Sequence, residues 1–192
     1  KLMEVCRMRD TPVIVFINKM DREGQDAFDL LDEIESKLQI KVRPMSWPIG
    51  IGATFKGVYH IHKDELNLFD GNKTSIEKNV HKTNGINDSA LTDLIGTEET
   101  DLLREEVELV DGVYDAFDRD KYLEGKIAPV FFGSALNNFG VQELLDSFIE
   151  ISPTPQGRST EKRIIEPDED KFSGFVFKIH ANMDPKHRDR IA

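Results

Sequence analysis

The sequence predicts an α/β protein built on a parallel sheet, and two kinds of segment carry that prediction. Residues 13–17 form a short apolar run rich in β-branched side chains, directly behind Pro12, and residues 127–134 form a second such run. Apolar runs without alternation are typical of strands buried on both faces, as in a parallel sheet. Each run is followed by an amphipathic helical pattern, at residues 25–38 and 141–149. This order of elements favours the α/β class.

Length and composition set limits on the class of protein. With 192 residues, 39% of them hydrophobic and 32% charged, the chain is long enough for one large globular domain or slightly more. No apolar run approaches the ~20 residues that a membrane-spanning helix needs. The net charge of −11 argues against a domain that wraps nucleic acid through general basicity. We therefore expect no membrane partner and no sequence-specific nucleic-acid partner.

The ends and the single cysteine give two further expectations. Cys6 is the only cysteine, so internal disulfides are excluded and a reducing, cytoplasmic compartment is expected. No signal-peptide pattern opens the chain. The sequence starts at Lys1 and stops at Ala192 just after a charged segment. We expect it to be a fragment of a longer polypeptide.

Elements of the first third follow from spacing. Residues 1–10 read as the last turns of a helix, with basic side chains near its end. Residues 25–38 carry apolar side chains at helical spacing, and their acidic side chains form a solvated face. Residues 42–49 read as one extended segment, in which Trp47 is expected to lie in the core rather than to stack on a ligand.

A segment of different character, residues 56–95, is predicted to be an insert. Alternating apolar side chains at 58–62 and 66–69 predict antiparallel strands, and residues 70–73 suit the turn between two strands. His60 and His62 are expected to lie exposed on one face of a strand. They could share a metal, but no third ligand has suitable spacing, so no metal site is predicted. The polar stretch 82–95 reads as a loop.

The remaining elements complete the predicted order. Thr97 is a plausible N-cap for a helix that runs to about residue 117, and 118–124 is a connector or a short helix. Helix 141–149 should cover the sheet with its apolar side chains, and Pro153 ends it. We place the first domain at 1–152, a charged linker at 153–170 and the start of a β domain at 171–192, with a strand at 172–179.

The end of the first predicted strand carries a motif, N-K-x-D, that suits a guanine base. Guanine presents two adjacent donors, a ring N–H and an exocyclic amine. The carboxylate of Asp21 can accept from both, and adenine would leave that carboxylate unpaired. Asn18 can bridge the base and the neighbouring loop, and the four-carbon stem of Lys19 can lie along the face of the base. Ligands bind at the carboxyl ends of the strands in such sheets.

The second apolar strand ends in a loop that suits the same base. Ser134, Ala135 and Leu136 follow it directly. Because the side chain at 135 is small, its backbone N–H can approach a ligand closely and donate to the guanine carbonyl. The four-residue motif at 18–21 also occurs by chance in unrelated sequences. The alternative interpretation is a strand that ends in a polar turn without a binding role. Two loops that read one base make the constellation specific.

These motifs resemble those of the translational GTPases, and within them the bacterial peptide chain release factor 3 family. The resemblance covers essentially the whole chain and is carried by residues 18–21, 47–50, 55–60, 129–140, 170–179 and 181–190. It implies the later half of a P-loop GTPase domain with its three-layer sheet, an antiparallel insert at about 56–95, and the start of a β-barrel domain. It also implies that Asn18, Lys19 and Asp21, with Ser134, Ala135 and Leu136, bind the base of GTP or GDP.

The implied activity is GTP hydrolysis on the ribosome that drives off the codon-reading release factors. However, no G-x-x-x-x-G-K-S/T segment is present in the sequence, so nothing here cradles phosphates or holds Mg²⁺. We therefore expect no catalytic residue in this chain and no hydrolysis by the chain alone. An elongation-factor-type GTPase and a non-catalytic interaction module remain the alternatives.

Overall fold

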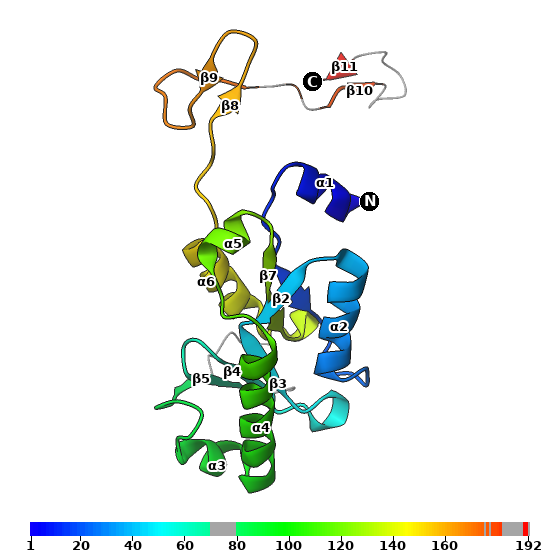
Figure 1. Ribbon diagram of the computed structural model, residues 1–192, viewed down its shortest axis with the longest axis vertical. Helices are drawn as coiled ribbons and strands as arrows, with labels where there is room; N and C mark the ends of the chain where they lie inside the picture. The colour runs from blue at the N-terminus through cyan, green and yellow to red at the C-terminus, as the bar shows by residue number, and fades with distance from the viewer. Residues whose placement is uncertain (70–79, 175, 177, 182–189, 192) are drawn as a thin grey trace. The chain divides into compact units, whose positions relative to one another are not determined.

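The computed structural model describes residues 1–69, 80–174, 176, 178–181 and 190–191. The chain divides into two compact units, Lys1–Ser152 and Pro153–Ala192. Figure 1 labels the helices and strands of both units.

The first unit is built around a parallel three-stranded sheet, which confirms the predicted fold class. Its strands are β1 (Val15–Ile17), β7 (Ile127–Phe132) and β2 (Lys41–Pro44), in the order β1-β7-β2. Ile17 lies opposite Phe132, and all pairs are parallel. Every residue of the central strand β7 is buried, whereas β1 is only half-buried. The prediction that β1 is buried on both faces was wrong because, within the described residues, only β7 pairs with it.

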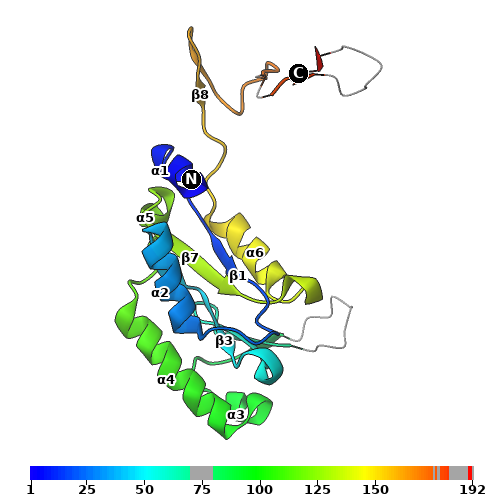
Figure 2. The ribbon, with the colours of Figure 1, turned by 90° about the vertical axis from the view of Figure 1, so that its right-hand side faces the viewer.

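Two helices cover the opposite faces of this sheet, α2 (Ala27–Leu38) and α6 (Val141–Ile151), as Figure 2 shows. The side chain of Asp26 caps α2 by accepting from the backbone N–H of Phe28 at 2.8 Å. The buried residues of α6 are Ser147 and Ile151, and part of its predicted core stripe is exposed, namely Leu145, Phe148 and Ile149. The prediction for this face of α6 was wrong, since its apolar arc is wider than the part that the described sheet covers.

A second, antiparallel sheet continues directly from the first. Its strands are β3 (Ser46–Ile49), β4 (Gly57–His60), β5 (Glu65–Leu68) and β6 (Val80–Lys82), in that order. Met45 joins the sheets, because its N–H donates to Val130 and its carbonyl accepts from Ile61. The expected single segment 42–49 is therefore two strands in two sheets. The predicted antiparallel strands are confirmed, and the predicted turn at 70–73 lies outside the described residues.

The long helix α4 and several short helical segments are the other elements described in this unit. They are α1 (Leu2–Met8), the 3-10 turn η1 (Gly52–Thr54), α3 (Ala90–Ile95), α4 (Thr97–Val113) and α5 (Arg119–Leu123). The stretch 82–95 was wrongly predicted to be only loop, since α3 buries Leu91 and Ile95. Gly96, with φ 97°, lies between α3 and α4 and takes the cap position that was predicted for Thr97.

Trp47 lies in the core as predicted, at 1% exposure, with its ring centroid 4.6 Å from Phe28 and 5.7 Å from Phe132. His60 was predicted to be exposed, but only 4% of it is. It belongs to the inner strand β4, and its ring centroid lies 6.2 Å from that of Phe131. His62 is exposed and follows the end of that strand, so the two histidines do not share a strand face.

The described residues of the second unit form two short antiparallel strand pairs. In the first, β8 (Arg158–Ser159) pairs with β9 (Ile164–Ile165), inside the region predicted to be a linker. In the second, β10 (His180–Ala181) pairs with β11 (Arg190–Ile191). The described residues of 172–179 lie in no strand, and residues 175 and 177 of the strand predicted there lie outside the described residues.

Candidate functional site

The two predicted base-reading loops lie at one edge of the parallel sheet. Strands β1 and β7 are parallel neighbours, so their carboxyl ends meet, and each is followed by one of the loops. Backbone hydrogen bonds join the two loops where they leave their strands. The N–H of Gly133 donates to the carbonyl of Ile17 at 3.0 Å, and the N–H of Met20 donates to the carbonyl of Gly133 at 3.1 Å. The structure therefore brings residues 18–21 and 134–136 together.

Asn18 joins the two loops through its side chain. Its Oδ1 accepts from the backbone N–H of Lys19 at 2.8 Å and from that of Ala135 at 2.9 Å. The Ala135 N–H, expected to be available to a ligand, is thus engaged by Asn18 in this structure. The bond fixes the distance between two segments that are 117 residues apart in the sequence.

The backbone of the first loop is firmly anchored. Met20 is buried at 3% exposure, and its carbonyl accepts from Gly52 N–H at 2.9 Å. Lys19 adopts a left-handed conformation, φ 70°, and is exposed. Residues other than glycine rarely adopt this backbone conformation without a constraint. Here the hydrogen bonds of the Lys19 and Met20 N–H groups provide one. Lys19 is thus presented at the surface of the loop.

Asp21 carries the most informative feature of the site. Its Oδ2 accepts from Nδ2 of Asn137 at 3.2 Å. Its Oδ1 is buried and has no hydrogen-bond partner among the described residues. A buried acceptor without a donor costs free energy, about 1–3 kcal/mol, so such a group favours a ligand that brings a donor.

The second loop is closed on itself. Ser134 and Phe139 exchange two backbone hydrogen bonds, at 2.9 and 3.0 Å, and the 3-10 turn η2 (Ala135–Asn137) lies between them. Gly133 and Gly140 allow the close approach of the loop's two ends: a Cβ on Gly133 would lie 2.3 Å from the carbonyl oxygen of Phe139. The loop is therefore held in one shape by its own backbone.

Exposure differs sharply among the predicted residues of this loop. Ser134 is 1% exposed, whereas Leu136 is 82% exposed. Sequence reasoning missed Asn137, which contacts both Asp21 and Ser134 through Nδ2, the latter at 2.9 Å. The signal that could have found it is an amide side chain directly after the Ser-Ala-Leu segment.

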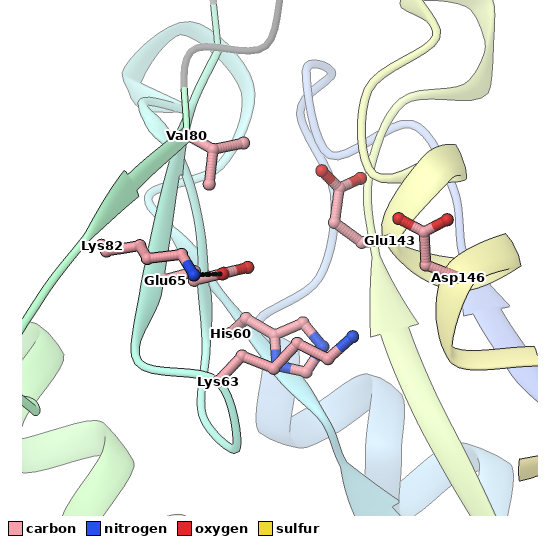
Figure 3. Close-up of a pocket in the computed structure, with 7 residues that line it drawn as sticks. All are labelled: His60, Lys63, Glu65, Val80, Lys82, Glu143 and Asp146. Carbon is pink, nitrogen blue, oxygen red and sulfur yellow. Dashed lines mark ion pairs between the residues drawn. The ribbon is translucent and has the colours of Figure 1, made fainter. Parts of the chain in front are cut away.

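A separate pocket of about 330 Å³ lies between the antiparallel sheet and α6 (Figure 3). Figure 3 shows His60 and Lys63 beside each other, and Glu143 and Asp146 across from them on α6. Burial, then the nearby Lys63 ammonium, lowers the pKa of His60 to about 4, so its ring is neutral at pH 7. Within the described ranges no group of three or more His, Cys, Asp or Glu side chains could hold a metal ion.

The family of the chain follows from a comparison of its sequence. Residues 1–154 match the family described as the elongation factor Tu GTP binding domain. The chain belongs to this family. These are translational GTPases, which bind guanine nucleotides and act on the ribosome. The two loops that were predicted to read the base lie inside the matched residues.

A solved structure gives a likeness at the level of the fold. A crystal structure of a protein from Thermus thermophilus matches with a TM-score of 0.52 at 18% identity. The match covers 80% of this chain and 24% of that one, so this chain spans about a quarter of that protein's length. Among the described helices, none is long and apolar enough to cross a membrane.

Proposed function

We propose that this chain selects the guanine base in a translational GTPase of the release factor 3 type. The observation that carries the proposal is the Asp21 carboxylate, whose buried Oδ1 has no donor among the described residues. It lies where the loops after β1 and β7 meet, and it needs a ligand that supplies N–H donors. A guanine base supplies two of them side by side.

The other residues act around that carboxylate. Asn18 holds the second loop through Ala135 N–H at 2.9 Å and keeps its side-chain amide available for the base. The exposed Lys19 lays its stem along one face of the ring. The second loop borders the base with Ser134, Ala135 and Leu136. GTP and GDP share this base, so both are expected to bind.

The two loops after β1 and β7 are not proposed to bind the phosphates or to hydrolyse GTP. No phosphate-cradling G-x-x-x-x-G-K-S/T segment is present in the sequence, and the described residues form no cluster suited to Mg²⁺. We expect the purified chain to show no GTP turnover above that of the Asp21→Ala variant. Turnover that depends on Asp21 would refute this division of labour.

The base assignment is tested by exchanging donor and acceptor at position 21. Asp21→Asn presents an amide, which suits the xanthine edge better than the guanine edge. When Asp21→Asn is introduced into the native protein, the ratio of its affinities for GDP and xanthosine diphosphate should shift by a factor of about 10 or more towards xanthosine diphosphate. A factor of this size corresponds to about one charge-assisted hydrogen bond. Unchanged guanine preference would mean that Asp21 does not read the base.

The step of translation is proposed from the sequence resemblance, above all from residues 170–179 and 181–190. The protein would act in the cytoplasm on ribosomes after peptide release and promote dissociation of the codon-reading release factors. The test follows a fluorescent release factor on such ribosomes. GTP-dependent acceleration of its departure by the native protein, lost in Asp21→Ala, is expected. Acceleration of translocation instead would favour an elongation-type GTPase.

A further inference from the structure

We propose that Asn137 is a positioning residue, which orients the Asp21 carboxylate and thereby sets how strongly guanine is preferred to other bases. The inference rests on the proposed function, because it assumes that Asp21 meets the base. It concerns a side chain outside the N-K-x-D and Ser-Ala-Leu segments, and its support is the set of contacts that this side chain makes.

The contacts of Asn137 use both hydrogens of its side-chain amide nitrogen. Nδ2 donates to Oδ2 of Asp21 at 3.2 Å and to Oγ of Ser134 at 2.9 Å. The amide group carries two hydrogens, so both bonds can be made at once. Ser134 is 1% exposed and its Oγ is fixed in the protein interior. One end of this bridge is therefore rigid, and the other end is the carboxylate.

The backbone that carries Asn137 is also fixed. Its N–H donates to the carbonyl of Ser134 at 3.1 Å, inside the loop that Ser134 and Phe139 close. The next residue, Asn138, ends the turn in a left-handed conformation, φ 53°. A side chain held at its backbone and at Ser134 has one direction left for its second hydrogen, and that direction points to Asp21.

An aspartate carboxylate rotates with little resistance about its last torsion. The bond to Asn137 limits this rotation at Oδ2. Each carboxylate oxygen can accept more than one hydrogen bond, so Oδ2 can accept from a second donor, and the buried Oδ1 has no hydrogen-bond partner among the described residues. Guanine can therefore bind while Asn137 stays in place. Fixing the acceptor beforehand removes an ordering cost from binding.

A purely structural role, that of holding the two loops together, is already filled by other bonds. Asn18 Oδ1 accepts from Ala135 N–H, and Met20 N–H donates to Gly133. Loss of Asn137 leaves both of these bonds in place. Its particular contribution is the direction of the carboxylate, and that should show as base selectivity rather than as stability.

The experiment measures GDP and ADP binding to the native protein by competition with a fluorescent nucleotide. Asn137→Leu keeps the size of the side chain and removes both donors; we expect GDP to bind roughly tenfold more weakly, in line with one lost bond to a charged group, with ADP unchanged. Asn138→Gly is the matched control, since it changes the adjacent, exposed asparagine and retains its left-handed backbone. That control should stay within about twofold.

The possible outcomes separate the two proposals. If Asn137→Leu weakens GDP and ADP equally, or changes neither, the positioning role is wrong. If Asp21→Ala leaves the GDP-to-ADP ratio unchanged, the proposed function itself fails, and with it this inference. A lost ratio in Asp21→Ala with a retained ratio in Asn137→Leu rejects the role of Asn137 alone. Should the leucine variant not fold, Asn137→Ala gives the same comparison.

Discussion

The indole N–H of Trp47 donates to Oε2 of Glu106 at 2.8 Å, and this bond ties strand β3 to helix α4. Trp47 is almost fully buried, so its single polar atom needs an acceptor. Burial raises the pKa of the Glu106 carboxyl, and the bond from Trp47 opposes that rise only in part. The half-buried carboxylate of Glu106 therefore costs free energy through desolvation, but it supplies the acceptor that the indole N–H needs.

Two substitutions separate the acceptor from the charge. Glu106→Leu leaves the indole N–H without a partner and should lower the free energy of unfolding by about 1–3 kcal/mol. Glu106→Gln keeps an acceptor oxygen and removes the charge, so it should be at least as stable as wild type at pH 7. A raised pKa means that the folded state holds the proton more tightly than the unfolded state. The stability that protonation contributes is therefore present below the ordinary pKa of 4.5 and lost as the pH rises.

Urea unfolding followed by the fluorescence of Trp47, the only tryptophan, measures both variants. Glu108→Gln, on an exposed position of α4, is the control and should change stability by less than about 0.5 kcal/mol. The advantage of Glu106→Gln should shrink as the pH falls towards 4.5. Equal destabilisation by leucine and glutamine at position 106 would contradict the role of the acceptor.

His60 gives a pH dependence of opposite sign. Its pKa is lowered to about 4 from 6.5, so between these values the unfolded chain binds a proton that the folded chain refuses. The stability that the neutral ring contributes should be fully present above pH 6.5 and fall as the pH drops towards 4, by on the order of 3 kcal/mol. His60→Leu removes this group and should flatten that part of the profile.

The measurement is the free energy of unfolding at several pH values between about 4 and 7, for wild type and variant. Other groups titrate over the same range, so the difference between the two profiles isolates His60. His180→Leu, at an exposed position of the second unit, should retain the wild-type slope. A His60→Leu profile parallel to that of wild type would show that the ring binds its proton equally well in the folded and unfolded states.

Periodicity and apolar runs were sufficient to predict the parallel sheet and most helices, because those patterns report local burial. They failed where burial depends on distant partners. The short helix α3 is stabilised by burying Leu91 and Ile95, and nothing in its polar neighbourhood indicates that. Likewise, alternation placed His60 in a strand, but the pattern did not indicate that its ring would face Phe131 of β7 and be buried.

The site shows the same division. Asn18, Asp21 and Ala135 stood out because the chemistry of a guanine base demands those groups at strand ends. Asn137 did not, since an asparagine in a loop resembles any solvated turn residue. Its contact with Asp21 joins positions 116 residues apart, and only the folded chain brings them together.

The last prediction concerns Gly140, which closes the second loop. Its φ is 76°, and an added Cβ would lie 2.6 Å from the carbonyl oxygen of Phe132. Gly140→Ala should therefore destabilise the first unit by about 1–3 kcal/mol and weaken GDP binding, because the backbone would have to move away from β7. Gly112→Ala is the matched control: Gly112 lies within α4, and its added Cβ would meet nothing within 4 Å. Since alanine is the better helix former, the control should stabilise by up to about 1 kcal/mol. Thermal and urea unfolding of both variants measure this, and a Gly140→Ala protein as stable as the control would mean that the loop tolerates a side chain there.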